Sequence, residues 1–339
     1  MPCLIEAECG DSIELGDLVE ILETQGFDPS DEASMAAFGP ALRKLANNRR
    51  FLGDLVIEEL KQHCFTQKER NHYSSQVILL HGGSRKFLLR ANFWPADGDG
   101  VMVNSGRDPF FYGLPHDHNF SFLTVGYLGS GYWSDYYEYD YGQVVGVSGE
   151  QVDLRFVERS RLSPGKVLLY RRNRDVHAQF PPDDLSVSLN IMALSPVSEF
   201  RDQYSFDTER STVAKVISAS ALETLVRLAG QIGGGNGADL VERFARNHPS
   251  ARIRFAALRA RADLASDPDA RIGLYERAAA ETLGPVSVLA AAAAERLRRA
   301  RPWLDEAAAV RRDLAASAPV DGREEEARYS PTVAPPPPG

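Results

Sequence analysis

Three histidines have the types and the spacing that metal-dependent chemistry requires. His116 and His118 are separated by one residue, and His177 follows much later in the chain. In a β-strand, residues i and i+2 point to the same side, so the first two imidazoles should share one space while Asp117 points away. A neutral imidazole is the commonest protein ligand for first-row transition metals. The spacing therefore predicts one metal ion bound by His116, His118 and His177.

Three imidazoles on one side of an ion leave coordination positions open, which is typical of a catalytic metal site rather than a structural one. The other four histidines show no such pattern and are interpreted as surface or core residues: His63, His72, His81 and His248. Three cysteines, Cys3, Cys9 and Cys64, lack the spacing of a disulfide framework or a metal site.

The histidines stand among segments with the pattern of β-strands. Apolar or alternating runs separated by turn residues predict strands over 77–80, 86–94, 120–128, 132–141, 144–147, 152–159, 167–170 and 185–191. Alternation within 86–94 places Arg90, Asn92 and Trp94 on one face, and either face could line a barrel. The stretch 95–114, with aromatic residues near its end, is predicted to form a loop over the barrel mouth.

The order of these features resembles the two metal-binding motifs of the cupin superfamily. It comprises His-x-His, hairpins, the turn Ser163-Pro164-Gly165-Lys166, a strand, His177 and a last strand, within residues 75–196. The resemblance implies an antiparallel β-barrel of the cupin or jelly-roll type. Many cupins carry a glutamate a few residues after His-x-His, but residues 120–124 hold no carboxylate. Glu138 is the one acidic residue considered as a fourth ligand.

A cupin with three histidine ligands resembles the cysteine dioxygenase-like thiol dioxygenases, which bind ferrous iron and activate dioxygen. The resemblance is carried by Lys86-Phe87-x-Leu89 leading to Trp94, by the histidine pair, and by Ser186-Val187-Ser188-Leu189. The chain also departs from that family. Phe122-Leu123 and Ile191-Met192-Ala193 stand where animal members carry a cross-linked cysteine and tyrosine. No arginine occurs in 73–76, where the family's carboxylate-binding arginine is expected, so Arg90 is its candidate replacement.

The resemblance implies a non-haem Fe(II), dioxygen-dependent oxygenase acting on an amino acid-like small molecule or on a residue of a peptide or protein. Asn119, Asn190 and Glu138 are predicted to orient the imidazoles, and Tyr127 or Tyr136 to hydrogen-bond bound oxygen. Two alternatives stay open. One is a cupin that uses nickel, copper, manganese or zinc as an isomerase or dioxygenase, because three imidazoles select iron weakly. The other is a non-enzymatic binding or scaffold protein with a vestigial cupin.

The flanking segments read as helices. We expect an α+β multidomain chain in which residues 1–72 form helices that pack on the barrel and 73–198 form the barrel. Within the first segment, Gly39-Pro40 should break a helix over 32–47. Residues 199–212 are predicted to be a connector that leads into an α-helical domain, 199–317, either a bundle or HEAT-like repeats that hold a peptide or protein. The Pro-rich tail 318–339 is predicted to be disordered.

Composition limits the functional classes. The chain of 339 residues is 43% hydrophobic and 25% charged, which is ordinary for a globular protein. Its net charge of −9 argues against a general nucleic-acid binder. No continuous apolar run is long enough to span a membrane, and the N-terminus lacks the pattern of a signal peptide, so a cytoplasmic protein is expected.

Overall fold

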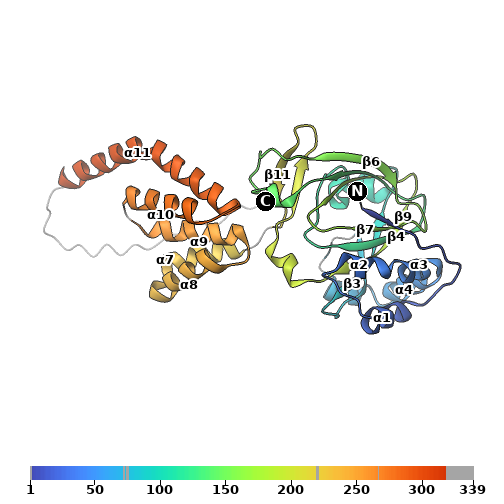
Figure 1. The fold of residues 1–339 in the computed structure, drawn as a ribbon. Helices are drawn as coiled ribbons and strands as arrows, with labels where there is room; N and C mark the ends of the chain where they lie inside the picture. Colours follow the sequence, from blue (N-terminus) through green and yellow to red (C-terminus); the bar gives the residue numbers. More distant parts are fainter. Residues whose placement is uncertain (1, 72, 74–75, 219–220, 266, 318–339) are drawn as a thin grey trace, which may run out of the picture.

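Two antiparallel β-sheets pack against each other in the computed structural model (Figure 1). The structure describes all residues except 1, 72, 74–75, 219–220, 266 and 318–339; the predicted disordered tail lies outside the described residues. The larger sheet has the strand order β1 (Cys3–Ile5), β7 (Val167–Tyr170), β4 (Phe122–Leu128), β9 (Ser186–Ala193), β3 (Phe87–Trp94) and β2 (Val77–His81). The smaller sheet has the order β6 (Arg155–Arg161), β5 (Trp133–Glu138) and β8 (Asp175–Phe180).

Helices cover the outer face of the six-stranded sheet. They are α1 (Leu15–Thr24), α2 (Glu32–Ala37), α3 (Gly39–Asn47), α4 (Phe51–Lys61) and α5 (Phe65–Arg70). As predicted, the helix over 32–47 is interrupted: α2 ends at Ala37, and Gly39-Pro40 begin α3 after Phe38. Gly39 also permits close packing, because a Cβ there would lie 2.6 Å from the Ile5 side chain.

Alternation along the central strands divides their side chains between two environments. Phe87, Leu89 and Ala91 of β3 point toward the helices and belong to one apolar core with Leu18 and Leu22 of α1. The intervening residues of β3 point toward the smaller sheet, as do Phe122 of β4 and Tyr170 of β7. The sheet therefore presents one face to a purely apolar core and the other to the space between the two sheets.

The chain combines strands and helices, as predicted. In the part of the chain that the structure describes, however, no ladder of hydrogen bonds between the named strands joins the two sheets. Single bridges, such as Tyr112 with Gln179, link neighbouring segments. The closed barrel therefore stays a prediction. The mouth loop contains α6 (Gly100–Ser105) and a 3-10 turn over Asp108–Phe110.

The segment predicted as a connector, 199–212, contains one strand and a turn instead, and a second strand begins at its end and continues into the part predicted to be helical. β10 (Tyr204–Asp207) and β11 (Thr212–Val216) form a hairpin whose Tyr204, Phe206 and Val213 share a small core with Tyr139 and Val176. The prediction was wrong because Glu209-Arg210 and other polar residues form the turn of this hairpin and hide its short apolar alternation. Conversely, the predicted strand over 144–147 is irregular, and a 3-10 turn, Tyr141–Gln143, precedes it.

Helices form the C-terminal part, after a 3-10 turn over Pro196–Phe200 and the β10–β11 hairpin. They are α7 (Leu222–Ile232), α8 (Gly234–Asn247), α9 (Ala251–Leu264), α10 (Pro268–Glu281) and α11 (Pro285–Ser317). Ser250 and Asp267 cap α9 and α10 through their side chains. Consecutive helices pack on one another, while a regular repeat stays a prediction. Among the described residues, no helix combines the length and apolarity needed to cross a membrane.

The shared core predicts that the N-terminal helices stabilise the sheet. Replacing Leu22, which is fully buried, by alanine should lower the free energy of unfolding by about 2–5 kcal/mol through lost burial and a cavity. Leu60→Ala on α4, where the side chain is 63% exposed, is the matched control and should cost less than about 0.5 kcal/mol. Urea denaturation measures both, and equal effects would show that α1 is not part of the core.

Candidate metal centre

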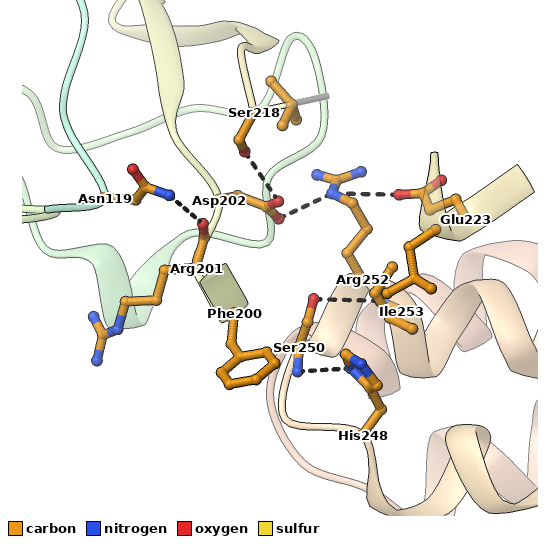
Figure 2. A pocket seen from close by; sticks show the side chains of 12 residues that line it. Asn119, Phe200, Arg201, Asp202, Ser218, Glu223, His248, Ser250, Arg252 and Ile253 are labelled. Carbon is orange, nitrogen blue, oxygen red and sulfur yellow. Dashed lines mark hydrogen bonds and ion pairs between the residues drawn. The ribbon is translucent and has the colours of Figure 1, made fainter. Parts of the chain in front are cut away.

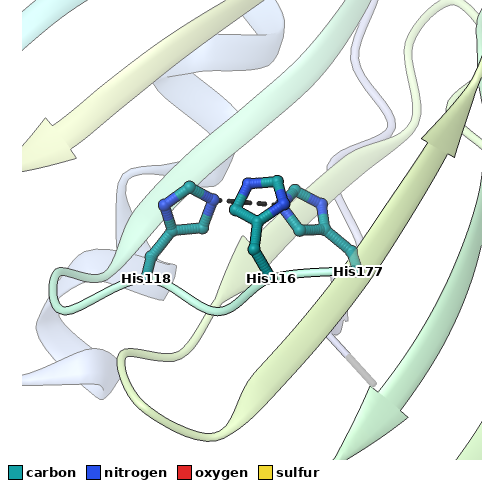
Figure 3. A group of neighbouring side chains, drawn as sticks. All are labelled: His116, His118 and His177. Carbon is teal, nitrogen blue, oxygen red and sulfur yellow. Dashed lines mark hydrogen bonds between the residues drawn. The ribbon is translucent and has the colours of Figure 1, made fainter. Parts of the chain in front are cut away.

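The three histidines converge at one point between the sheets (Figure 3). His177 lies on β8, and its backbone N–H and C=O bond reciprocally to those of His116, at 3.0 Å each. Directly paired residues of an antiparallel ladder place their side chains on the same side. One nitrogen from each ring can be chosen so that all three atoms lie within 4.8 Å of one another.

The sequence predicted that the histidine pair lies in a regular β-strand. In the structure it lies in an irregular segment instead. His116 makes only isolated bridges, to His177 on one side and to Ser205 on the other. The segment is nevertheless extended, so His116 and His118 still face the same space and Asp117 faces away. The physical basis of the prediction therefore holds, although the element is an irregular segment.

The Asp117 carboxylate anchors this segment. It is fully buried and accepts hydrogen bonds from the Tyr204 amide at 2.6 Å, the Tyr139 hydroxyl at 2.6 Å and the Asn173 side-chain amide at 2.9 Å. Burial raises the pKa of Asp117 to about 6, although these hydrogen bonds act in the opposite direction. Three donors from three different segments therefore hold the residue between the two imidazoles.

The nitrogens are spaced as ligands of one small ion would be. His118 Nε2 lies 3.0 Å from His177 Nε2. Two ligand atoms at right angles, each about 2.1 Å from a transition metal, are separated by about 3.0 Å. The Nδ1 atom of His116 lies 2.8 Å from the Leu114 carbonyl oxygen. A proton on that atom satisfies the carbonyl and leaves Nε2 with a free lone pair. The donor set therefore fits a divalent transition metal.

The electrostatic environment keeps the imidazoles neutral. Burial lowers the pKa of all three histidines, most strongly for His118 and His177. Repulsion between neighbouring imidazolium charges acts in the same direction for His118 and His177. Neutral rings are the form that binds a metal.

Two glutamines lie beside the outer nitrogens of the histidines. The Gln179 amide is 3.0 Å from Nδ1 of His177, and the Gln203 amide is 3.4 Å from Nδ1 of His118. Such contacts fix the orientation of the rings in metal sites. Neither glutamine was predicted. Gln179 could have been found from its position two residues after His177 on the same strand, whereas Gln203 precedes a strand that the sequence did not reveal.

A cavity of about 410 Å³ lies over the three imidazoles. Much of its wall is aromatic, from Trp94, Phe111, Phe120, Phe122 and Tyr132. Phe111 belongs to the predicted mouth loop, and its ring centre is 6.0 Å from that of His116. The mouth loop thus contributes to the cavity, as the sequence indicated.

The remaining wall carries buried polar atoms that have no hydrogen-bond partner among the described residues. They are Gln76 Nε2, Arg90 Nε, Asn92 Oδ1, Gln179 Oε1 and Asn190 Oδ1. Arg90 on β3 pairs directly with Asn190 on β9, so the two side chains point the same way. Because a buried polar atom without a partner is costly, several around one cavity indicate a polar ligand.

Arg90 provides a positive charge at this wall. Its guanidinium lies over the Tyr73 ring, 5.0 Å from the ring centre, and it forms no ion pair within the described part of the chain. Burial lowers the pKa of Arg90. Arg90 is half-buried, and a partly desolvated cation without a carboxylate partner favours the binding of an anion. The sequence did not decide which face of β3 points inward. In the structure, the face that carries Arg90 lines the cavity.

The other predicted site residues are placed differently. Asn190 lines the cavity, while Tyr136 stands one layer behind it, its hydroxyl 3.0 Å from that of Tyr170. Tyr127 points to the opposite face of the sheet, where its hydroxyl donates to the Asn48 carbonyl, so it does not reach the cavity. Tyr127 lies five residues after Phe122, which faces the cavity. Because side chains alternate along a strand, this odd separation places Tyr127 on the opposite face.

Glu138 is not part of the histidine group. Its carboxylate pairs with Arg171 at 2.8 Å and with Arg155 at 2.7 Å. Burial alone would raise the pKa of Glu138, but positively charged neighbours including Arg171 outweigh it and lower the pKa to about 2. The histidines are the one group of possible metal ligands of this kind found within the described residues.

A second cavity, of about 520 Å³, lies beside α9 (Figure 2). Gln203 faces the metal-site cavity, whereas the adjacent Asp202 faces the second cavity and pairs with Arg252 of α9 at 2.9 Å. Asn119, predicted to orient an imidazole, instead donates to the carbonyls of Ser198 and Arg201 at 2.7 and 3.2 Å. The helical part is therefore tied to the segment that holds Gln203.

No protein-family model matches the chain, and no curated protein sequence matches it. Solved structures show limited similarity. The DMSP lyase DddQ from Ruegeria pomeroyi DSS-3 has 14% identity and a TM-score of 0.22, over 34% of this chain and 45% of that protein, so the chain spans under half of its length. Hydroquinone 1,2-dioxygenase PnpCD, in complex with Cd²⁺ and 4-hydroxybenzonitrile, has 10% identity and a TM-score of 0.23, over 39% and 71%. A structure reported with the DMSP lyases RdDddP and RnDddQII has 13% identity and a TM-score of 0.22, over 56% and 77%.

The geometry predicts that each histidine is needed for metal binding. His116→Ala, His118→Ala and His177→Ala should each weaken the affinity for Fe²⁺ or Zn²⁺ by about 100-fold or more, because one of three ligands is lost. Anaerobic titration with a competing chelator measures this affinity. His81→Ala is the control, since His81 stacks on Phe87 and does not line the cavity. Unchanged affinity in the three variants would contradict the assignment.

The Asp117 anchor gives a second prediction. Asp117→Asn keeps the size of the side chain but turns an amide N–H₂ toward hydrogen-bond donors, which should cost about 2–3 kcal/mol of unfolding free energy. Metal affinity should fall by about tenfold, because the spacing of the imidazoles is no longer fixed. Asp183→Asn at the surface is the control. Full stability together with full affinity in Asp117→Asn would show that the anchor has no role.

Proposed function

We propose that the chain is a non-haem iron oxygenase of the three-histidine cupin type that acts on a small, amino acid-like anion. The observation that carries the proposal is the combination of three converging imidazoles with a cavity whose polar wall contains Arg90, an arginine without a carboxylate partner among the described residues. The cupin resemblance of the sequence supports the same assignment. The iron and the substrate belong to the proposal.

His116, His118 and His177 would hold the metal. A ferrous ion on these ligands would supply the activation of dioxygen. Because all three ligands are neutral, the site keeps the full positive charge of the ion, which favours an anionic donor from the substrate, such as a thiolate or a carboxylate. Gln179 and Gln203 would keep the imidazoles oriented.

Arg90 would bind the carboxylate of the substrate. A guanidinium presents paired N–H donors that match a carboxylate, and the half-buried position of Arg90 strengthens that interaction. Asn190 on the neighbouring strand and Asn92 two positions along β3 add polar atoms on the same side. Bound substrate would thus supply the carboxylate that Arg90, which lies over the Tyr73 ring, lacks among the described residues.

The aromatic wall would exclude water from the reacting groups. Trp94 and Tyr132 lie with ring centres 4.1 Å apart, and Phe122 stacks on Tyr170 at 4.4 Å. Burial raises the pKa of Tyr132, Tyr136 and Tyr170, so their hydroxyls keep their protons and act as hydrogen-bond donors. Of these, Tyr132 lines the cavity and replaces Tyr136 as the candidate donor to a bound ligand.

The volume of the cavity favours a small molecule. About 410 Å³ lies at the lower end of the range of ligand pockets in proteins. A peptide residue could enter only with its side chain, or with a C-terminal carboxylate that reaches Arg90. The substrate class that fits best is therefore a free amino acid or a related small thiol or carboxylic acid.

The proposal is tested by oxygen uptake after anaerobic loading with Fe²⁺. We expect uptake with at least one member of a panel of amino acids, thiol carboxylates and their amides, and the amide should be the weaker substrate. Arg90→Leu should raise KM for the carboxylate by about 30-fold or more, while its effect on the amide is small. Arg90→Lys, which keeps the charge, should restore part of the affinity.

Metal analysis of the purified protein is the measurement that can contradict the oxygenase proposal. Stoichiometric nickel, copper, manganese or zinc, with no oxygen uptake after iron loading, would replace the oxygenase by the alternative of a cupin with another metal. Loss of activity with both carboxylate and amide in Arg90→Leu would show that Arg90 supports the fold rather than the substrate.

A further inference from the structure

The helical part of the chain differs in charge from the rest. Residues 222–317 contain 15 arginines, no lysine and 12 acidic residues, although the whole chain has a net charge of −9. Four arginines line a single groove of about 600 Å³ formed by α8, α9, α10 and the first turn of α11.

We call this the arginine groove and define it by Arg246 of α8, Arg254 and Arg261 of α9, and Arg277 of α10, together with Leu258 and Leu274. Arg254, Leu258 and Arg261 are spaced at four and three residues, so they share one face of α9. Leu274 and Arg277 share a face of α10 for the same reason. The groove therefore has an apolar floor between basic rims.

The arginines are only partly neutralised by the protein. Arg246 and Arg261 both pair with one carboxylate, that of Glu242, at 2.5 and 2.6 Å. Arg254 donates to the His248 and Pro249 carbonyls, which carry no net charge. Arg277 is exposed and has no ion-pair partner within the described residues. Glu281 is the one acidic side chain at the rim.

We propose that the arginine groove binds an acidic segment of a partner protein, with an apolar side chain on Leu258 and Leu274 and carboxylates on the arginines. Guanidinium groups bind carboxylates through paired hydrogen bonds, and a cationic rim speeds the encounter with an anionic partner. An apolar floor adds burial that a purely ionic surface lacks. The proposal concerns a separate site and does not depend on the identity of the metal.

Two other occupants fit less well. The chain's own acidic cluster, Glu324-Glu325-Glu326, follows α11, whose first turn adjoins the groove and whose last residue is on the order of 40 Å away. The seven residues from 318 to 324 span at most about 25 Å, which is too short for a return. Single-stranded nucleic acid generally requires aromatic side chains for base stacking, and none lines the groove.

Fluorescence anisotropy with the full chain tests the proposal. The probes are three labelled peptides of about 12 residues: one with alternating glutamates and leucines, one with serine in place of leucine, and one with lysine in place of glutamate. The first should bind saturably, and the other two should bind at least about tenfold more weakly. The double variant Arg246→Glu/Arg277→Glu should lower the affinity for the first peptide by about tenfold or more.

A matched double variant separates the groove from general charge. Arg299→Glu/Arg311→Glu changes the net charge equally at exposed positions of α11 outside the groove, and it should leave the affinity unchanged. Equal loss in both double variants, or no saturable binding of the first peptide, would overturn the proposal. Metal stoichiometry and circular dichroism of each variant are readouts of the fold. Because His118→Ala should retain peptide binding, failure here is distinguishable from failure of the proposed oxygenase.

Discussion

The candidate metal centre depends on one pair of backbone hydrogen bonds, between His116 and His177. These bonds place two imidazoles from distant parts of the chain on the same side of an antiparallel pair. His118 joins them because the segment stays extended past Asp117, whose buried carboxylate is held by three donors. The spacing of the ligands is thus a property of the backbone and its anchor, and the ring contacts only refine it.

Charge complements this geometry. The cavity holds neutral imidazoles, uncharged amides and one guanidinium, and no carboxylate among the described residues that line it. The nearby carboxylates face away from the cavity: Glu138 pairs with Arg171, and Asp117 is held by three uncharged donors. The proposed preference for an anion would therefore rest on the absence of carboxylates from the cavity wall as much as on Arg90.

The sequence predicted the parts whose signal is periodic. Strand alternation identified the central strands and placed Arg90 with Trp94, and His-x-His with His177 predicted the three histidines that converge. The sequence could not place Tyr127. The face on which a strand residue lies depends on the register, and a shift of one residue moves a side chain to the opposite face. Nor could the sequence find Gln203, because the hairpin that follows this residue is short and its pairing is set by tertiary contacts with Tyr139 and Val176.

The residues that flank β10 and β11 also determine how far the chain can be truncated from its C-terminal side. Gln203 and Ile217 form part of the cavity wall, although both lie beyond the end of the cupin-like stretch. A fragment that stops near Pro196 would open the cavity to solvent on that side. It would also lack Tyr204, whose backbone amide donates to Asp117. A fragment that keeps this part of the cavity wall therefore extends to about Ser218, whose hydroxyl accepts from the Gln203 backbone amide. It would expose Asp202, whose Arg252 partner is left behind, so replacing that aspartate by a neutral residue is a rational accompaniment to the truncation.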